Sequence, residues 1–87
     1  MPEICRFLGI IIYMYFNEHN PPHFHAKYNE HKASILIENL GILEGELPPK
    51  VYSIVAEWAM EHKAELLRNW HEMEQTGQFS KIEPYVK

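Results

Sequence analysis

The chain is poor in several residue types, and each shortage argues against a class of site. Its 87 residues contain no aspartate, so all twelve acidic side chains are glutamates. Aspartate is the residue most used in magnesium sites and in orienting catalytic triads, so neither kind of site is favoured. The single cysteine, Cys5, cannot form a disulfide within the chain, and it excludes a zinc site built from cysteines.

Long apolar runs and positive charge are also scarce. No apolar run approaches the roughly 20 residues that span a bilayer, and the first residues lack a basic region and a small-residue cleavage site. We therefore expect a cytoplasmic protein without membrane contact. The formal net charge is -4, with lysines and arginines scattered among glutamates, whereas proteins that bind nucleic-acid backbones usually carry a basic stripe. The charge thus gives no indication of a nucleic-acid partner.

Histidine, by contrast, is concentrated in one segment. Four of the six histidines lie within residues 19–31. His23 and His25 directly follow the pair Pro21-Pro22, which fixes two backbone φ angles and holds the chain extended. Alternate residues of an extended chain share a face, so the two imidazoles should project the same way.

This spacing makes a divalent-metal site one hypothesis, and zinc, nickel or iron would suit it. The third ligand could come from His19 across the proline loop, from His31 across a predicted hairpin, or from Glu18. The candidate ligands are therefore His19, His23, His25 and His31. In the competing interpretation, His23 and His25 lie on the solvent face of a sheet or donate hydrogen bonds that brace the Pro-Pro loop.

A hydrolase or nuclease is a further alternative. His23 or His25 would then act as general acid or base, and Arg6, Lys27 or Lys32 would hold a phosphate. The acidic balance argues against this alternative, and no second catalytic group stands at a fixed spacing. The sequence identifies no catalytic residue and does not decide whether the protein is an enzyme.

The first half of the chain predicts an antiparallel, meandering sheet of three to four strands. Its β-branched and aromatic runs place strands at residues 4–16, with a break at Gly9, and at 23–28, 32–38 and 42–44. Asn29-Glu30 supplies a tight turn between the second and third strands.

The second half predicts one long amphipathic helix over residues 49–75, followed by a tail over 78–87 that can fold back. Apolar residues recur at spacings of three and four, proline stands at the first turn, and Gly77 is placed to end the helix. Such a helix would be roughly 40 Å long, against an expected radius of gyration of about 12 Å. Its far end must therefore bend or pack on a partner. The whole chain, residues 1–87, is expected to form a single α+β domain.

Three aromatic residues are candidates for assembly. Trp58 and Trp70 lie on roughly one stripe of the predicted helix, where they would be core or interface anchors. Tyr15 belongs to the first strand. Together they suggest contact with a companion protein or with a second copy of the chain.

The chain also resembles a known family along nearly its whole length. The segments that carry the resemblance are Pro2-Glu3-Ile4, Phe7-Leu8-Gly9-Ile10, Met14-Tyr15, His19-Asn20-Pro21-Pro22-His23-Phe24-His25-Ala26-Lys27-Tyr28, Leu47-Pro48, Glu57-Trp58, His62 and Leu66-Leu67-Arg68-Asn69-Trp70. They are similar to the bacterial domain-of-unknown-function family 4160, whose proline-histidine segment is highly specific. The resemblance implies a small cytoplasmic protein, often encoded beside a member of domain-of-unknown-function family 2442, and it supplies no catalytic residues.

That pairing suggests a two-gene module of a toxin–antitoxin-like or regulatory kind. We therefore expect a protein-interaction component that binds a companion small protein or forms a homodimer. The alternative is a histidine-based divalent-metal protein, or a metal-dependent hydrolase or nuclease.

Overall fold

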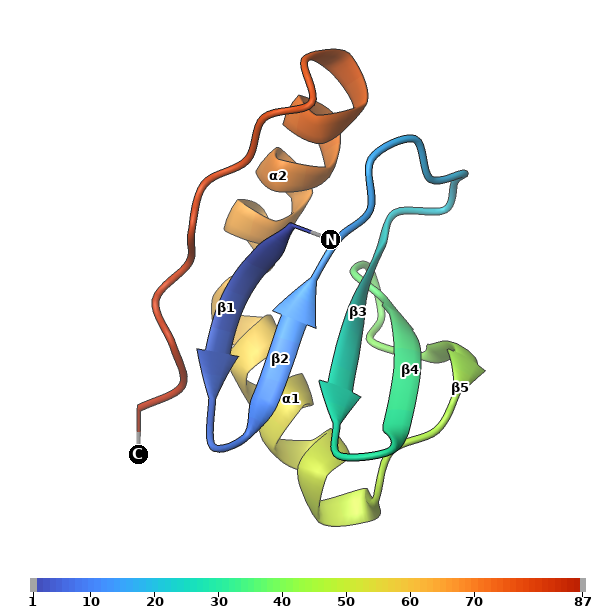
Figure 1. The fold of residues 1–87 in the computed structure, drawn as a ribbon, viewed down its shortest axis with the longest axis vertical. Helices are drawn as coiled ribbons and strands as arrows, with labels where there is room; N and C mark the ends of the chain where they lie inside the picture. Colours follow the sequence, from blue (N-terminus) through green and yellow to red (C-terminus); the bar gives the residue numbers. More distant parts are fainter. Residues whose placement is uncertain (1, 87) are drawn as a thin grey trace.

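An antiparallel sheet forms the first half of the chain, and two helices cover one of its faces (Figure 1). The computed structural model describes residues 2–86. The five strands follow one another in the sheet in the order β1-β2-β3-β4-β5. Their bounds are β1 Glu3–Phe7, β2 Ile10–Tyr13, β3 His23–Tyr28, β4 His31–Leu36 and β5 Ile42–Gly45. The α+β class and the antiparallel meander are confirmed, whereas the expected count of three to four strands is too low.

The additional strand arises because the predicted strand over residues 4–16 is a hairpin. Leu8 and Gly9 both have positive φ angles, of 52° and 78°, and they reverse the chain between β1 and β2. Two consecutive positive φ angles suit the twist of a two-residue hairpin turn. Leucine rarely adopts this conformation, so the sequence predicts a break at Gly9 and not a turn over both residues.

The second hairpin follows the prediction closely. Asn29-Glu30 connects β3 to β4, and Tyr28 pairs with His31 next to the turn. The strand predicted at 32–38 ends at Leu36, because the Leu36 carbonyl accepts a hydrogen bond from the Leu40 N–H and begins the next turn.

The predicted single helix is wrong in detail, because it consists of α1 (Pro49–Glu61) and α2 (Lys63–Gln75). His62 lies between them with φ -122° and ψ 25°, which is not helical. Its side chain contacts the Trp58 ring, and its Nδ1 lies 2.6 Å from the Glu65 carboxylate. The length of the predicted helix left two alternatives, a bend or packing on a partner, and the structure shows an interruption of the helix at His62. No helix among residues 2–86 is long and apolar enough to cross a membrane.

The core lies between the sheet and the helices, and the C-terminal segment completes it. Trp58 is 1% exposed, packs against Phe24, and donates its indole N–H to the Glu83 carbonyl at 2.8 Å. Asn69 binds Ser80 through two reciprocal hydrogen bonds. The segment therefore runs beside β1, as Figure 1 shows, and the expected folding back of the tail is confirmed over its described part.

Candidate metal site

The two histidines at the start of β3 meet a carboxylate from the loop before that strand. Glu18, His23 and His25 each offer one ligand atom, and these atoms all lie within 4.8 Å of one another. His23 and His25, which the strand spacing predicts to project the same way, therefore lie close together. Of the three possible third ligands, the structure brings Glu18 to them.

Strand alternation explains why these side chains are available. Phe24 and Ala26 are fully buried toward the helices, so His25 points to the opposite face of the sheet. We call this face, which the helices do not cover, the open face. His23 lies at the first position of β3, where the loop returns to the sheet, and its ring centroid is 5.2 Å from that of His25.

Each imidazole has a hydrogen-bond partner on its other nitrogen. The His23 Nδ1–H donates to the Pro21 carbonyl at 2.8 Å, which leaves Nε2 to face the cluster. The His25 Nδ1 lies 3.1 Å from the hydroxyl of Ser34, the residue that pairs with it across the hairpin. Such bonds fix the tautomer and the ring orientation of metal-binding histidines.

One oxygen of the Glu18 carboxylate faces both imidazole rings. Glu18 Oε1 lies 3.2 Å from His23 Nε2 and also contacts His25 Nε2. A carboxylate oxygen can accept a hydrogen bond from a ring N–H, or it can share a cation with the two ring nitrogens. The cluster therefore offers one oxygen and two nitrogens as possible ligand atoms.

Aromatic rings enclose the cluster and limit its contact with water. The Tyr13 ring stacks on His25 with centroids 5.1 Å apart, the Tyr15 ring meets His25 edge-on at 4.9 Å, and Trp70 lies 5.1 Å from His23. Burial raises the pKa of the Tyr13 phenol, and the nearby Tyr15 adds to that shift. Tyr13 therefore stays neutral beside the cluster at physiological pH.

The structure does not bring the other two candidate histidines into the cluster. His31 pairs with Tyr28, so the register assigns it to the face opposite His25, and it is exposed. His19 is exposed in the loop although it directly follows Glu18. Among residues 2–86, the ligand atoms that lie within 4.8 Å of one another belong to His23, His25 and Glu18.

The three candidate assembly residues differ in exposure. Trp58 and Trp70 are 1% and 5% exposed and pack within this chain, whereas Tyr15 is 43% exposed. Core packing within one chain accounts for the two tryptophans. Assembly through Tyr15 stays a prediction.

Ser34 is the site residue that sequence reasoning missed. A signal for it was present, because a two-residue turn at Asn29-Glu30 fixes the register and places Ser34 opposite His25. The same register argument would have removed His31 from the ligand set.

The family model described as domain of unknown function (DUF4160) matches residues 9–71 of the 87. The chain belongs to the DUF4160 family. The part matched to DUF4160 includes the whole cluster and Ser34, and it leaves out β1 and the C-terminal segment. No curated protein and no solved structure matches the chain.

Proposed function

We propose that this DUF4160 protein binds one divalent transition-metal ion through Glu18, His23 and His25. The observation that carries the proposal is the meeting of three ligand atoms within 4.8 Å. Ligands at about 2.1 Å from a tetrahedral ion lie about 3.4 Å from one another. The Glu18 oxygen and His25 Nε2, which are in direct contact, would therefore move apart by roughly 1 Å to admit the ion. Two imidazoles and one carboxylate form a donor set used for zinc and for non-haem iron.

The hydrogen bonds around the cluster support a ligand role for both histidines. A carbonyl behind His23 and a hydroxyl behind His25 hold each Nε2 toward Glu18. The side chains of His23 and His25 are only 7% and 14% exposed, so their positions are well restrained. A cation between them would satisfy the one carboxylate oxygen that both rings face.

Three protein ligands leave at least one coordination position open. Structural zinc sites are usually closed by four protein ligands, whereas catalytic sites keep a position for water or substrate. The proposed site is therefore of the catalytic kind, where the ion could activate a water molecule or polarise a bound oxygen. A metal-dependent hydrolase or nuclease would need such a site, and zinc, nickel and iron are its candidate metals.

The test is the metal content of untagged protein, measured by inductively coupled plasma mass spectrometry. Wild type should hold close to one equivalent after loading with zinc and gel filtration. His23→Ala, His25→Ala and Glu18→Gln should each lose most of it, since each removes one of three ligands. His31→Ala is the matched control because it deletes an exposed imidazole from the same hairpin.

The result also separates metal binding from an ion pair that only braces the loop. If Glu18 and the histidines are a structural pair alone, wild type holds no zinc and its melting temperature does not change with zinc or chelator. That outcome, or equal loss of zinc in His31→Ala, would refute the proposal. Circular dichroism of each variant shows whether a loss of metal follows from a loss of fold.

A further inference from the structure

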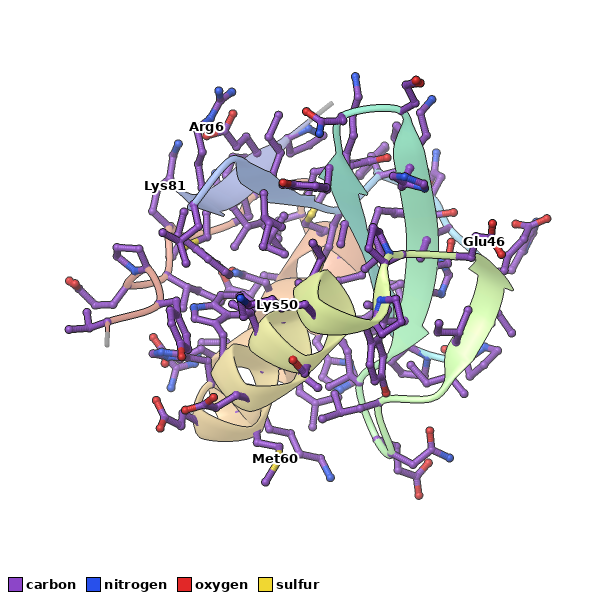
Figure 2. All side chains as sticks on the ribbon, turned by 90° about the horizontal axis from the view of Figure 1, so that it is seen from below. Arg6, Glu46, Lys50, Met60 and Lys81 are labelled. Atoms are coloured by element: carbon purple, nitrogen blue, oxygen red, sulfur yellow. The ribbon has the colours of Figure 1, made fainter. Side chains whose placement is uncertain are left out.

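Three cationic side chains form a row across the open face, beside the proposed metal site. Arg6 pairs with Ile11, Ile11 pairs with Lys27, and Lys27 pairs with Lys32. Paired residues share a face of the sheet, and each of these residues has at least one buried strand neighbour on the other face, such as Ala26 beside Lys27 and Ala33 beside Lys32. Figure 2 shows Arg6 projecting away from the helices. We call Arg6, Lys27 and Lys32 the cation row.

Two members of the cation row have no counter-ion within residues 2–86. Arg6 is bound by the Glu3 carboxylate through two hydrogen bonds. Lys27 and Lys32 form neither an ion pair nor a hydrogen bond through their ammonium groups with any described residue. Like charges directly opposite each other on adjacent strands repel, and the protein carries an excess of negative charge elsewhere. The unpaired lysines therefore point to an anionic ligand.

A hollow on the open face lies between one member of the cation row and one of the proposed metal ligands. It has a volume of about 280 Å³, and Lys32, Ser34 and His25 line it. His25 and Lys27 are two positions apart on β3, which separates their Cα atoms by roughly 6.6 Å. A phosphate ester in the hollow would lie beside Lys32, Ser34 and the His25 ring.

The remaining walls of the hollow suit a flat ring. Tyr15 lines it and is 43% exposed, so its ring has a free surface for stacking. Glu44 lines the far side, where its carboxylate repels phosphate and can accept hydrogen bonds from a sugar or base. The charges thus place the phosphate near Lys27 and Lys32 and the organic part between Tyr15 and Glu44.

We propose that the open face binds a phosphate ester that carries a flat ring, with Lys27 and Lys32 holding the phosphate beside the metal. A nucleotide has this chemistry, either free or as part of a single strand. The assignment rests on the proposed metal site, since that site supplies the cation on the other side of the phosphate. A phosphate ester is thus the class of ligand that we assign to the open coordination position of the proposed metal site.

Isothermal titration calorimetry with zinc-loaded and metal-free protein tests the assignment. The probes are adenosine 5′-monophosphate, inorganic phosphate, adenosine and a short oligouridylate. The double variant Lys27→Gln/Lys32→Gln should bind the monophosphate at least about tenfold more weakly than wild type, the factor expected from one lost charge-assisted hydrogen bond. Lys50→Gln is the control, because Lys50 lies on α1 in the helical layer (Figure 2) and should bind as wild type does.

The metal content of the same samples keeps the two proposals apart. The double variant should retain the zinc of wild type, because neither lysine is a ligand. Zinc binding without phosphate-dependent binding, or affinity of the double variant within twofold of wild type, overturns this inference and leaves the metal site intact. Absence of zinc from wild type refutes the metal site, and the metal-free titrations then show whether the lysines bind phosphate alone. Tighter binding of the oligouridylate than of the monophosphate supports the inference and assigns the phosphate to a nucleic-acid strand, and the reverse order assigns it to a free nucleotide.

Discussion

Removing the Ser34 hydroxyl should weaken metal binding without removing any ligand. In Ser34→Ala the His25 Nδ1 loses its partner at 3.1 Å, and the ring is then free to rotate its Nε2 away from Glu18. Loss of a partner on the outer nitrogen of a ligating histidine typically costs 10- to 100-fold in metal affinity, about 1.4 kcal/mol or more. Tyr13 and Tyr15 pack on the same ring and limit its rotation, so we expect about tenfold.

The effect on folding should be smaller and separable. Ser34 is 7% exposed, and one lost hydrogen bond of this kind costs about 1 kcal/mol, or about 4–8 °C in melting temperature for a chain of this size. Zinc affinity is measured by competition with a chelating dye at a temperature where both proteins are folded. Ser53→Ala is the matched control, because it removes a hydroxyl that donates to the Lys50 carbonyl on α1.

A zinc affinity of fully folded Ser34→Ala within twofold of wild type would refute the prediction that the Ser34 hydroxyl holds the His25 ring for metal binding. That result would show that stacking alone holds the His25 ring. Equal weakening in Ser53→Ala would show that the loss comes from general destabilisation.

Three further predictions concern stability and titration. A Cβ on Gly45 would lie 2.2 Å from the Lys32 carbonyl oxygen at φ +81°, so Gly45→Ala should lower the free energy of unfolding by more than about 2 kcal/mol in urea titrations. Gly77→Ala, at a similar φ but against a side chain that can shift, should cost less, and equal losses would contradict this account. Burial raises the pKa of the Cys5 thiol, so Ellman's reagent at pH 8 should label the unfolded chain rapidly and the native protein at least about 100-fold more slowly; comparable rates would be inconsistent with the buried position. Burial also raises the pKa of the Tyr13 phenol above its ordinary value of 10.0, so the unfolded chain should lose that proton first and stability should fall as pH rises through about 10. Tyr13→Phe should reduce this slope, and an unchanged slope would rule out the assignment.

The parts of the sheet that depend on residues close together in the sequence could be predicted well. Alternation of buried and exposed residues fixed β3, and Asn29-Glu30 fixed both the turn and the register of its hairpin. The turn at Leu8-Gly9 could not be predicted, because leucine at positive φ is held there by pairing of β1 with β2 and not by its own preference.

The break between the helices could not be predicted either. No proline or glycine stands near His62, and the apolar spacing continues through it. At His62 the backbone N–H donates to the Ala59 carbonyl, three residues earlier, and φ is -122°. The side-chain contacts of His62 with Trp58 and Glu65 join residues four and three apart, which a continuous helix also brings together, so they do not mark the break.

In the candidate site, too, the residues on strands could be predicted from the sequence and the residue on the loop could not. Strand period placed His23 and His25 together, and the register could have excluded His31 and included Ser34. The sequence could not single out Glu18 as the third ligand. Side chains in a loop do not alternate regularly, so the spacing of residues does not predict which way a side chain points.

The loop that supplies Glu18 therefore determines the chemistry of the site. Two strands hold its ends: the Met14 N–H donates to the Pro2 carbonyl, and the Ile37 N–H donates to the Pro22 carbonyl. Between these anchors, the Pro21 carbonyl also accepts from His23, so the loop and a ligand restrain each other. The strand that carries both imidazoles fixes their positions, whereas the carboxylate, which comes from a loop, could adjust to a bound ion if the proposed site is occupied. We therefore expect metal preference to change with substitutions in residues 15–22, while substitutions in β3 outside His23 and His25 should alter stability.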